Sequence, residues 1–203
     1  SVKINSIFAP LQSLSIFEMK VHIALLLVAL AYGANYSIAK TVMPPVNPFA
    51  IIFCRVVGAG VLFWIFHRFT VNEKVKSAKD YGHLAICALF GVAINQMMFF
   101  KGLSLTNPIN ASVIMTTAPI MVLVASSILL KERLTLTKII GILLGAIGAL
   151  LLIGGTSFQF SSDTALGDFC ILLNAASYAT YLVIVKPLMK KYSAFTIIKW
   201  IFL

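Results

Sequence analysis

Long apolar runs alternate with short polar linkers along the chain. A helix needs about 20 apolar residues to cross the hydrocarbon core of a bilayer. Six runs reach that length: residues 21–42, 48–67, 81–100, 108–130, 136–155 and 167–188. A seventh begins near Phe195 and reaches only Leu203, too short to span. The pattern predicts an all-α polytopic membrane protein, and we expect these residues to be part of a longer chain.

The composition agrees with lipid as the surrounding solvent. Charged residues make up 11% of the chain and hydrophobic residues 60%, with a mean hydropathy of +0.99, whereas a soluble domain carries about 25% charged residues. The net charge of +10 does not indicate nucleic acid, because the basic side chains lie in short linkers rather than on one solvated face. Cys54, Cys87 and Cys170 lie singly within apolar runs, which predicts small buried hydrophobes.

The basic residues also predict an orientation, because cytoplasmic loops of membrane proteins are rich in Lys and Arg. With a cytoplasmic N-terminus, eleven basic residues fall in the inside segments and only Lys40 and Lys101 in the outside ones. The inside residues are Lys20, Arg68, Lys74, Lys76, Lys79, Lys131, Arg133, Lys138, Lys186, Lys190 and Lys191. We therefore expect a multi-pass protein of the inner (plasma) membrane with its N-terminus in the cytoplasm.

The chain matches itself at an offset of 146 positions. Residues 26–55 align with residues 172–201 without a gap, and ten of the thirty positions are identical, among them Tyr32 with Tyr178. The first unit holds five spans, an odd number, so a second copy would enter the membrane from the opposite side. This predicts an inverted five-plus-five transmembrane helix repeat of ten spans, of which about six and a half are present.

The repeat divides the chain into three segments. Residues 1–19 form an N-terminal extension, mildly polar, with Met19-Lys20 directly before the first span. It is either a non-native addition or a short interfacial helix. Residues 20–155 form the first five-helix repeat, and residues 156–203 begin the second, inverted one.

Several motifs resemble the EamA-type carriers of the drug/metabolite transporter (DMT) superfamily. They are Tyr32-Gly33-Ala34-Asn35, Arg55, the stretches Asn95 to Leu103, Ala111 to Pro119 and Leu130 to Leu134, and the glycines Gly141, Gly145 and Gly148. The similarity covers about residues 20–203. It implies ten helices, both termini in the cytoplasm, and export or facilitated passage of small metabolites. Tyr32 stands where the family often has Trp, which leaves the implied fold unchanged.

Polar side chains inside the apolar spans are candidates for a substrate site, because burying them in lipid is costly. Several recur at helical spacing and so share one face of their span. We predict that these residues line a cavity: Tyr32, Asn35, Tyr36, Arg55, Asn95, Gln96, Ser112, Thr116, Pro119, Asn174, Ser177, Tyr178 and Tyr181. The alternative is that they make hydrogen bonds between helices.

Two of these candidates carry alternatives of their own. Arg55 is the one cation clearly within a predicted span. It either attracts a substrate carboxylate or anchors to neighbouring carbonyl groups. Pro119 lacks a backbone donor, which predicts either a hinge or a fixed bend in its helix.

Together these features predict a secondary transporter, an exporter or facilitator of small metabolites such as amino acids, which works by alternating access between inverted repeats. We expect no catalytic residue, cofactor or metal, and not an enzyme. The alternatives are an intramembrane enzyme acting on a lipid or lipid-linked substrate, and a structural subunit that does not transport. The expected partners are a small-molecule substrate and the lipid bilayer, with no nucleic acid; a homodimer stays open.

Overall fold

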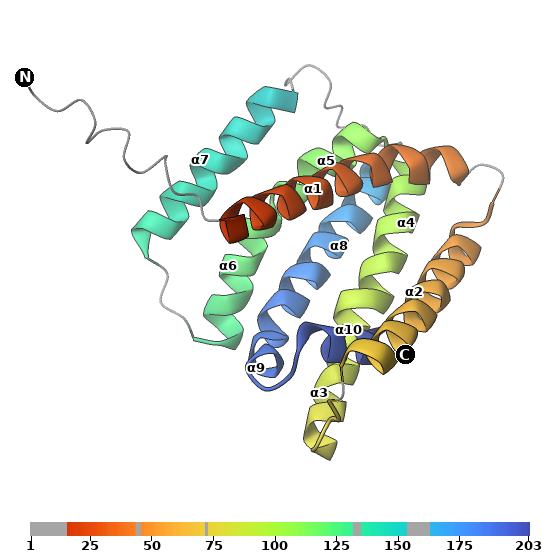
Figure 1. Ribbon diagram of the computed structural model, residues 1–203. Helices are drawn as coiled ribbons and strands as arrows, with labels where there is room; N and C mark the ends of the chain where they lie inside the picture. The colour runs from red at the N-terminus through yellow and green to blue at the C-terminus, as the bar shows by residue number, and fades with distance from the viewer. Residues whose placement is uncertain (1–15, 44–45, 72, 132–134, 154–162) are drawn as a thin grey trace, which may run out of the picture. The chain divides into compact units, whose positions relative to one another are not determined.

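The structure is a computed structural model that describes residues 16–43, 46–71, 73–131, 135–153 and 163–203. Within these ranges every regular element is helical (Figure 1). The chain divides into two compact units, Ser1–Ala39 and Lys40–Leu203. The smaller unit holds most of helix α1 (Ile16–Val42). Most of the predicted N-terminal extension, residues 1–15, lies outside the described residues.

The larger unit contains the remaining described helices. They are α2 (Pro48–Thr70), α3 (Ala78–Ala88), the π-helix η3 (Leu89–Ile94), α4 (Asn95–Leu105), α5 (Pro108–Met115), α6 (Ala118–Leu129), α7 (Leu136–Ile153), α8 (Ala165–Ile184), α9 (Lys186–Met189) and α10 (Ala194–Phe202). We call Ala78–Leu105, which joins α3, η3 and α4, span three, and Pro108–Leu129 span four.

Five helical segments are long and apolar enough to cross a membrane. They are Met19–Val42, Pro48–Phe69, span three, span four and Ala165–Met189. They match five of the six predicted spans. Helix α7 occupies the predicted span 136–155, but its described apolar part, Leu136–Gly145, is shorter than the others. The described chain is thus an all-α, multi-pass membrane protein, as predicted.

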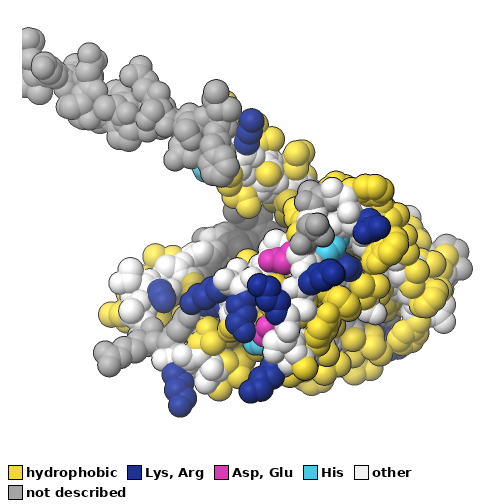
Figure 2. Space-filling view, turned by 60° about the horizontal axis from the view of Figure 1, so that its bottom comes forward, with side chains coloured by type: hydrophobic (Ala, Val, Ile, Leu, Met, Phe, Trp, Pro, Cys, Tyr) yellow, Lys and Arg dark blue, Asp and Glu magenta, His cyan; other side chains and the backbone are white. Residues whose placement is uncertain are grey.

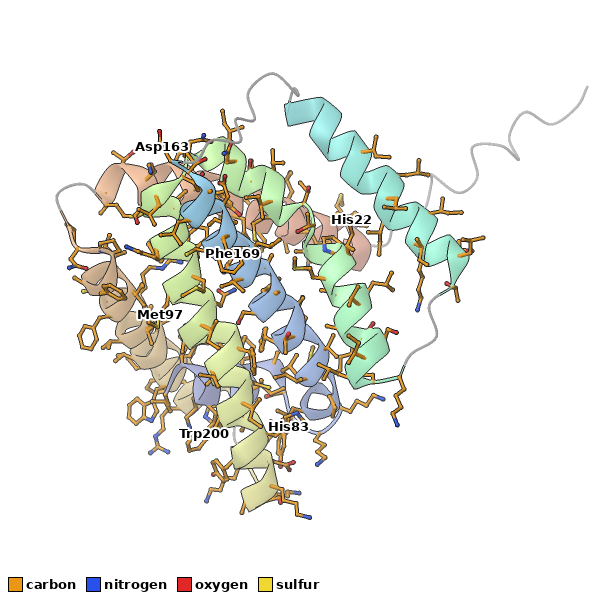
Figure 3. The ribbon with its side chains drawn as sticks, turned by 180° about the vertical axis from the view of Figure 1, so that it is seen from behind. His22, His83, Met97, Asp163, Phe169 and Trp200 are labelled. Carbon is orange, nitrogen blue, oxygen red and sulfur yellow. The ribbon has the colours of Figure 1, made fainter. Side chains whose placement is uncertain are left out.

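Helix α8 is the central helix of the larger unit. It packs against α4, η3, α5 and α6, and Figure 1 shows it between α4 and α6. Figure 3 shows Phe169 near the start of α8 and Trp200, in α10, at the opposite end of the unit. Ile171, Ala175 and Val183 are fully buried along α8. This helix therefore sets how its polar groups meet spans three and four.

Span three and α8 run in opposite directions. Asp80, in the first turn of span three, accepts a hydrogen bond from Tyr192, which follows α9. Thr106, directly after span three, donates to Asp168 in the first turn of α8. The linker before span three and the linker after α8 consequently share one end of the unit. This agrees with the alternation of spans that the basic residues predicted.

Span four is broken where the sequence predicted a kink. Helix α5 ends at Met115 and α6 begins at Ala118, with Pro119 in its first turn. The hydroxyl groups of Thr116 and Thr117 donate to carbonyl oxygens three residues earlier, at 2.6 and 2.7 Å. The missing N–H of proline and these local bonds together account for the interruption. The π-helical turn in span three was not predicted.

The start of the seventh predicted helix agrees with the repeat. Asn47 caps α2 and Ser193 caps α10, each through its side-chain oxygen, and these residues stand 146 positions apart. The offset is the one at which the sequence matches itself. The inverted arrangement of two complete units stays a prediction.

Candidate functional site

Polar side chains of α8 meet backbone carbonyl groups of span three halfway along both helices. The Ser177 hydroxyl donates to the Phe90 carbonyl at 2.6 Å, and Asn174 Nδ2 donates to the Asn95 carbonyl at 2.8 Å. A π-helical turn disturbs the regular bonding of its carbonyl groups, and lipid could not satisfy them. Asn174 and Ser177 are both buried, so they tie the two helices together where span three is irregular.

We call the contact of Asn174 and Ser177 with span three the seam, and an aromatic pair lies beside it. The ring centroids of Tyr178 and Tyr181 are 6.2 Å apart. Tyr181 packs over Gly91 in η3: a Cβ added at Gly91 would lie 2.7 Å from Tyr181 Cδ2. The tyrosine ring therefore requires glycine at this position. Both tyrosines keep part of their surface uncovered within the larger unit.

At the far end of span three a buried carboxylate holds three segments together. Asp168 accepts hydrogen bonds from Thr106 Oγ1 at 2.6 Å and from Thr164 Oγ1 at 3.2 Å, and Asn110 Nδ2 lies 3.4 Å from Oδ2. Asp168 is 6% exposed and Asn110 0%. A carboxylate out of water needs such donors. Asp168 thus joins the end of α4, the start of α5 and the start of α8.

Lys40 strengthens the same end of the unit. Its Nζ donates to the carbonyl oxygens of Leu103 and Thr106, each at 2.7 Å. The last carbonyl groups of a helix have no partner within it, so Lys40 caps α4. Close beside this cap, a Cβ added at Gly167 would lie 2.9 Å from the Gly102 carbonyl oxygen. The two glycines let the backbones of α4 and α8 approach closely.

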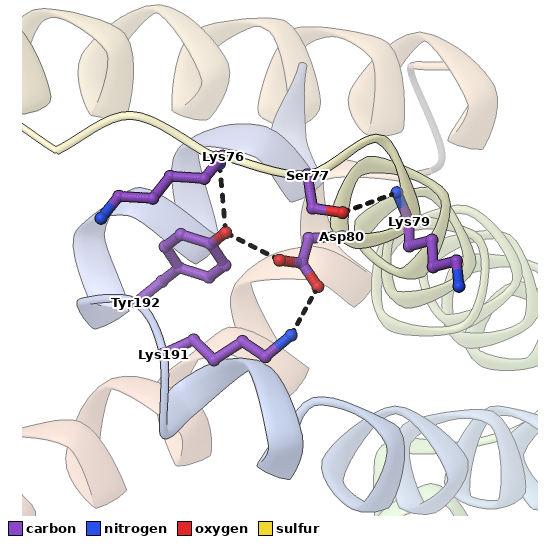
Figure 4. Close-up of polar contacts among 6 residues, drawn as sticks. All are labelled: Lys76, Ser77, Lys79, Asp80, Lys191 and Tyr192. Atoms are coloured by element: carbon purple, nitrogen blue, oxygen red, sulfur yellow. Dashed lines mark hydrogen bonds and ion pairs between the residues drawn. The ribbon is translucent and has the colours of Figure 1, made fainter.

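At the opposite end a second carboxylate joins span three to the segment after α9 (Figure 4). Asp80 accepts a hydrogen bond from the Tyr192 hydroxyl at 2.7 Å and forms an ion pair with Lys191 at 2.9 Å. The amide of Lys76 donates to the same tyrosine hydroxyl at 3.2 Å. The neighbouring carboxylate of Asp80 raises the pKa of Lys191. These contacts link residues more than 110 positions apart in the chain.

Glu73 makes a parallel connection to the start of α10. It accepts from the Thr196 hydroxyl at 2.7 Å and from the Ser193 amide at 2.9 Å. These donors hold the pKa of Glu73 below its ordinary range. His67 Nε2 lies 3.3 Å from Thr196 Oγ1, and its Nδ1 lies 3.5 Å from Lys199 Nζ. The end of α2 is thereby joined to α10.

An open hollow of about 890 Å³ lies at this end of the unit. It is lined by Glu73, Lys74, Lys76, Asp80, Lys191 and Tyr192. Figure 2 brings this end of the unit forward and shows Lys and Arg side chains gathered around acidic ones. The hollow is therefore a predominantly basic feature. No local pattern in the sequence predicts it.

The structure brings together only part of the predicted site. Asn95 and Asn174 meet directly, Ser177 reaches the neighbouring π-helical turn, and Tyr178 and Tyr181 lie side by side. The bonds of Asn174 and Ser177 are those of the alternative, interhelical interpretation. Whether any of these residues also contacts a substrate stays a prediction.

Other predicted residues lie apart from this seam. The hydroxyl groups of Ser112 and Thr116 donate to carbonyl oxygens of their own helix. Gln96 is half-buried and Pro119 exposed. Arg55 is exposed on α2, with its guanidinium carbon 5.2 Å from the centroid of the Phe100 ring in α4. This contact is a packing interaction between two helices.

The three candidates in α1 belong to the smaller unit. Tyr32, Asn35 and Tyr36 lie in one continuous helix, which confirms that their spacing places them on one face. Asn35 and Tyr36 are half-buried and Tyr32 is exposed.

Sequence reasoning missed both carboxylate clusters at the ends of span three. The chain has only six acidic residues, and Glu73 and Asp80 stand among basic neighbours in one linker. Two acidic residues among basic neighbours were the one sequence feature that could have indicated a contact there. Their partners, residues 191–196, are more than 100 positions away, so no local pattern could identify them.

Comparison with known proteins agrees with the described fold. The EamA-like transporter family matches residues 19–154. An uncharacterized transporter of Archaeoglobus fulgidus is 27% identical over 186 residues, covering 90% of this chain and 63% of its own length. The uncharacterized transporter YyaM of Bacillus subtilis is 28% identical over 179 residues, covering 85% and 58%. The WAT1-related protein At3g02690 of Arabidopsis thaliana is 28% identical over 165 residues, covering 78% and 39%.

One solved structure, titled only as the crystal structure of a protein, shares the fold. It superposes with a TM-score of 0.65 at 19% identity, over 86% of this chain and 61% of that one. The chain thus spans less than two thirds of the length of each of these proteins.

Proposed function

We propose, from the premise that this chain belongs to the EamA-like transporter family, that it works as a secondary transporter of small metabolites. The cargo class is neutral, zwitterionic or weakly anionic, with amino acids the first candidates. Within the described spans the acidic residues lie in terminal turns, at Asp80 and Asp168. A cationic cargo would need a carboxylate near mid-depth, where its charge could be balanced in lipid.

The observation that carries the proposal is the aromatic pair in the second half of α8. Tyr178 and Tyr181 lie side by side and are each half-buried, and Tyr181 packs over a glycine in a π-helical turn. Single π turns inside α-helices occur frequently at functional sites. Aromatic faces with hydroxyl groups suit small amphipathic molecules, because they offer both apolar surface and hydrogen bonds.

The hydrogen bonds between span three and α8 indicate which helices move when the substrate site opens to one side of the membrane and then to the other. Hydrogen bonds join them at the end of α4 and in the middle, and Tyr192, which follows α9, bonds Asp80 at the start of span three. We infer that these two helices move as one body and that other helices move against it. This refines the sequence prediction, in which the two repeats rock as separate wholes.

Flux through proteoliposomes tests the proposal. The full-length protein should carry at least one member of an amino acid panel with saturable kinetics. Tyr178→Ala and Tyr181→Ala should change the concentration for half-maximal flux. Tyr81→Phe is the matched control, because Tyr81 packs on Trp200 at the end of the unit. Saturable flux that is unaltered in both variants would refute the proposed cavity, and no flux for any amino acid would refute the cargo class.

The proposed orientation has a separate test. Single cysteines in a cysteine-free background should be labelled from outside at position 163 and from the cytoplasm at position 190. Both positions are exposed. Labelling of both from the same side would contradict the arrangement of α8 across the membrane.

A further inference from the structure

We propose that the basic hollow between the start of span three and the segment after α9 binds a phosphate group. The bearer is either the headgroup of an anionic phospholipid or a soluble phosphate. The hollow of about 890 Å³ is lined by three lysines, two carboxylates and a tyrosine. This is room for a whole headgroup rather than for a single ion. No transport role in the proposed function requires it.

Both carboxylates in the lining are already engaged. Asp80 accepts from Lys191 and Tyr192, and Glu73 accepts from a backbone amide and a threonine hydroxyl of the α10 start. Their charge is therefore directed at partners in the protein rather than at the hollow. A cation entering the hollow would have to compete with these partners.

The lysines are in the opposite situation. Lys74 and Lys76 are exposed, and within the described residues their ammonium groups make no hydrogen bond or ion pair. Only the amide of Lys76 is engaged, with Tyr192. Lys191 keeps its positive charge through its ion pair with Asp80. The hollow therefore has two available ammonium groups, and its lining carries a net charge of +1 from three lysines and two carboxylates.

The position of the hollow selects phosphate over other anions. It lies where span three begins and the α8 span ends, at the level of lipid headgroups if these helices cross the bilayer. Basic pockets between membrane helices on the cytoplasmic side bind phosphate-bearing headgroups. Lysine recognises phosphate as a point charge and can approach it from several directions. The lipid source rests on the proposed orientation; the soluble source does not.

Thermal unfolding of the full-length protein in detergent tests the proposal. The apparent Tm is measured against phosphatidylglycerol, phosphatidylcholine and inorganic phosphate at constant ionic strength. A ligand that binds the folded state raises Tm by mass action. Phosphatidylglycerol should raise it more than phosphatidylcholine. An equal rise with inorganic phosphate identifies a soluble phosphate as sufficient, and a rise with the lipid alone identifies the headgroup.

A matched pair of double variants assigns the effect to the hollow. Lys74→Gln with Lys76→Gln removes two lining charges, and Lys79→Gln with Lys190→Gln removes two charges outside the lining. The first pair should weaken phosphatidylglycerol binding about fivefold per lysine, and the second pair should not. Equal weakening in both pairs would reduce the effect to general surface charge and overturn the proposal. So would the lack of any Tm rise with either phosphate source. Amino acid flux is measured apart from this, so one proposal can fail while the other stands.

Discussion

The Tyr192 hydroxyl donates a 2.7 Å hydrogen bond to Asp80 Oδ2, across 112 positions of the chain. It joins the first turn of span three to the segment that leads into α10. Asp80 also pairs with Lys191, so one carboxylate serves two adjacent residues. Within the larger unit, this contact and the Glu73 contacts fasten the linker before span three to the start of α10, the second helix of the second predicted repeat.

Removing this contact should destabilise the protein measurably. Tyr192→Phe should lower the apparent Tm in detergent by a few degrees, and Asp80→Asn by more, because it also breaks the ion pair. In the Asp80→Asn background, Tyr192→Phe should lower the Tm much less, because the effects of two substitutions that remove the same interaction are not additive. Tyr81→Phe is the control. Fully additive effects of the two substitutions would contradict a shared contact.

Acid should weaken the Glu73 contact. Its donors, the Thr196 hydroxyl first and the Ser193 amide second, hold the pKa of Glu73 below its ordinary value of 4.5. A carboxyl group with a lowered folded pKa stabilises the fold above its unfolded pKa, and that stability is lost as the pH falls through the folded pKa. The wild-type Tm should therefore drop below about pH 4.5. The Tm of Glu73→Gln should be lower than that of the wild type at neutral pH, and it should fall less as the pH is lowered.

The acid series needs a control for the other carboxyl groups. Asp163→Asn removes a carboxyl group just before α8, at the other end of the unit. Its acid-dependent drop in Tm, measured alongside, shows how much a carboxyl group at that end of the unit contributes. The same drop in Glu73→Gln as in the wild type would show that Glu73 does not contribute to it.

The mid-membrane seam predicts a difference between two hydroxyl groups one turn apart on α8. Ser177 donates to span three, whereas Thr180 donates to Ala176 within its own helix. Ser177→Ala should cost about 0.6 kcal/mol, and at most about 1.7, the range of hydrogen bonds between membrane helices. Thr180→Ala should cost less. Unfolding in mixed micelles measures both; a larger cost for Thr180→Ala would contradict the seam as a tie between helices.

Glycine substitutions test the packing of Tyr181. Gly91→Ala places a Cβ 2.7 Å from Tyr181 Cδ2. The ring or the π-helical turn must shift, which we expect to cost about 1–3 kcal/mol. Gly58→Ala in α2 is the matched control, because no atom lies within 4 Å of its added Cβ. Equal stability of the two variants would mean that the ring moves away without cost.

Much of the fold was accessible from the sequence for one physical reason: lipid requires long, continuous apolar helices. The span boundaries at Pro48 and Pro108 follow from capping residues and proline at the first helical position. The break before Pro119 follows from its missing N–H. The π-helical turn at 89–94 had no local signal, because the side chains that bond the Phe90 carbonyl within it and the Asn95 carbonyl directly after it come from α8.

The candidate site was less accessible. Polar type and helical spacing identified Asn174, Ser177, Tyr178 and Tyr181 as residues with a role inside the membrane. They could not decide between a substrate and a neighbouring helix as the partner, because both demand the same polar side chains. The two residues that bond carbonyl groups of span three are buried, and the two tyrosines keep uncovered surface. Only the packed structure distinguishes the two residues that bond a neighbouring helix from the two tyrosines.

The sequence by itself determined that this is a helical membrane protein, where most of its spans begin and end, and how they alternate, since hydrophobic length and loop charge act locally. The tertiary structure decided that α8 is central, that η3 and α4 of span three are tied to it, and that a basic hollow forms at one end. Those outcomes depend on which distant residues meet. A buried carboxylate, hydroxyl or carbonyl group needs a hydrogen-bond partner, and the order of residues does not specify which group that partner is.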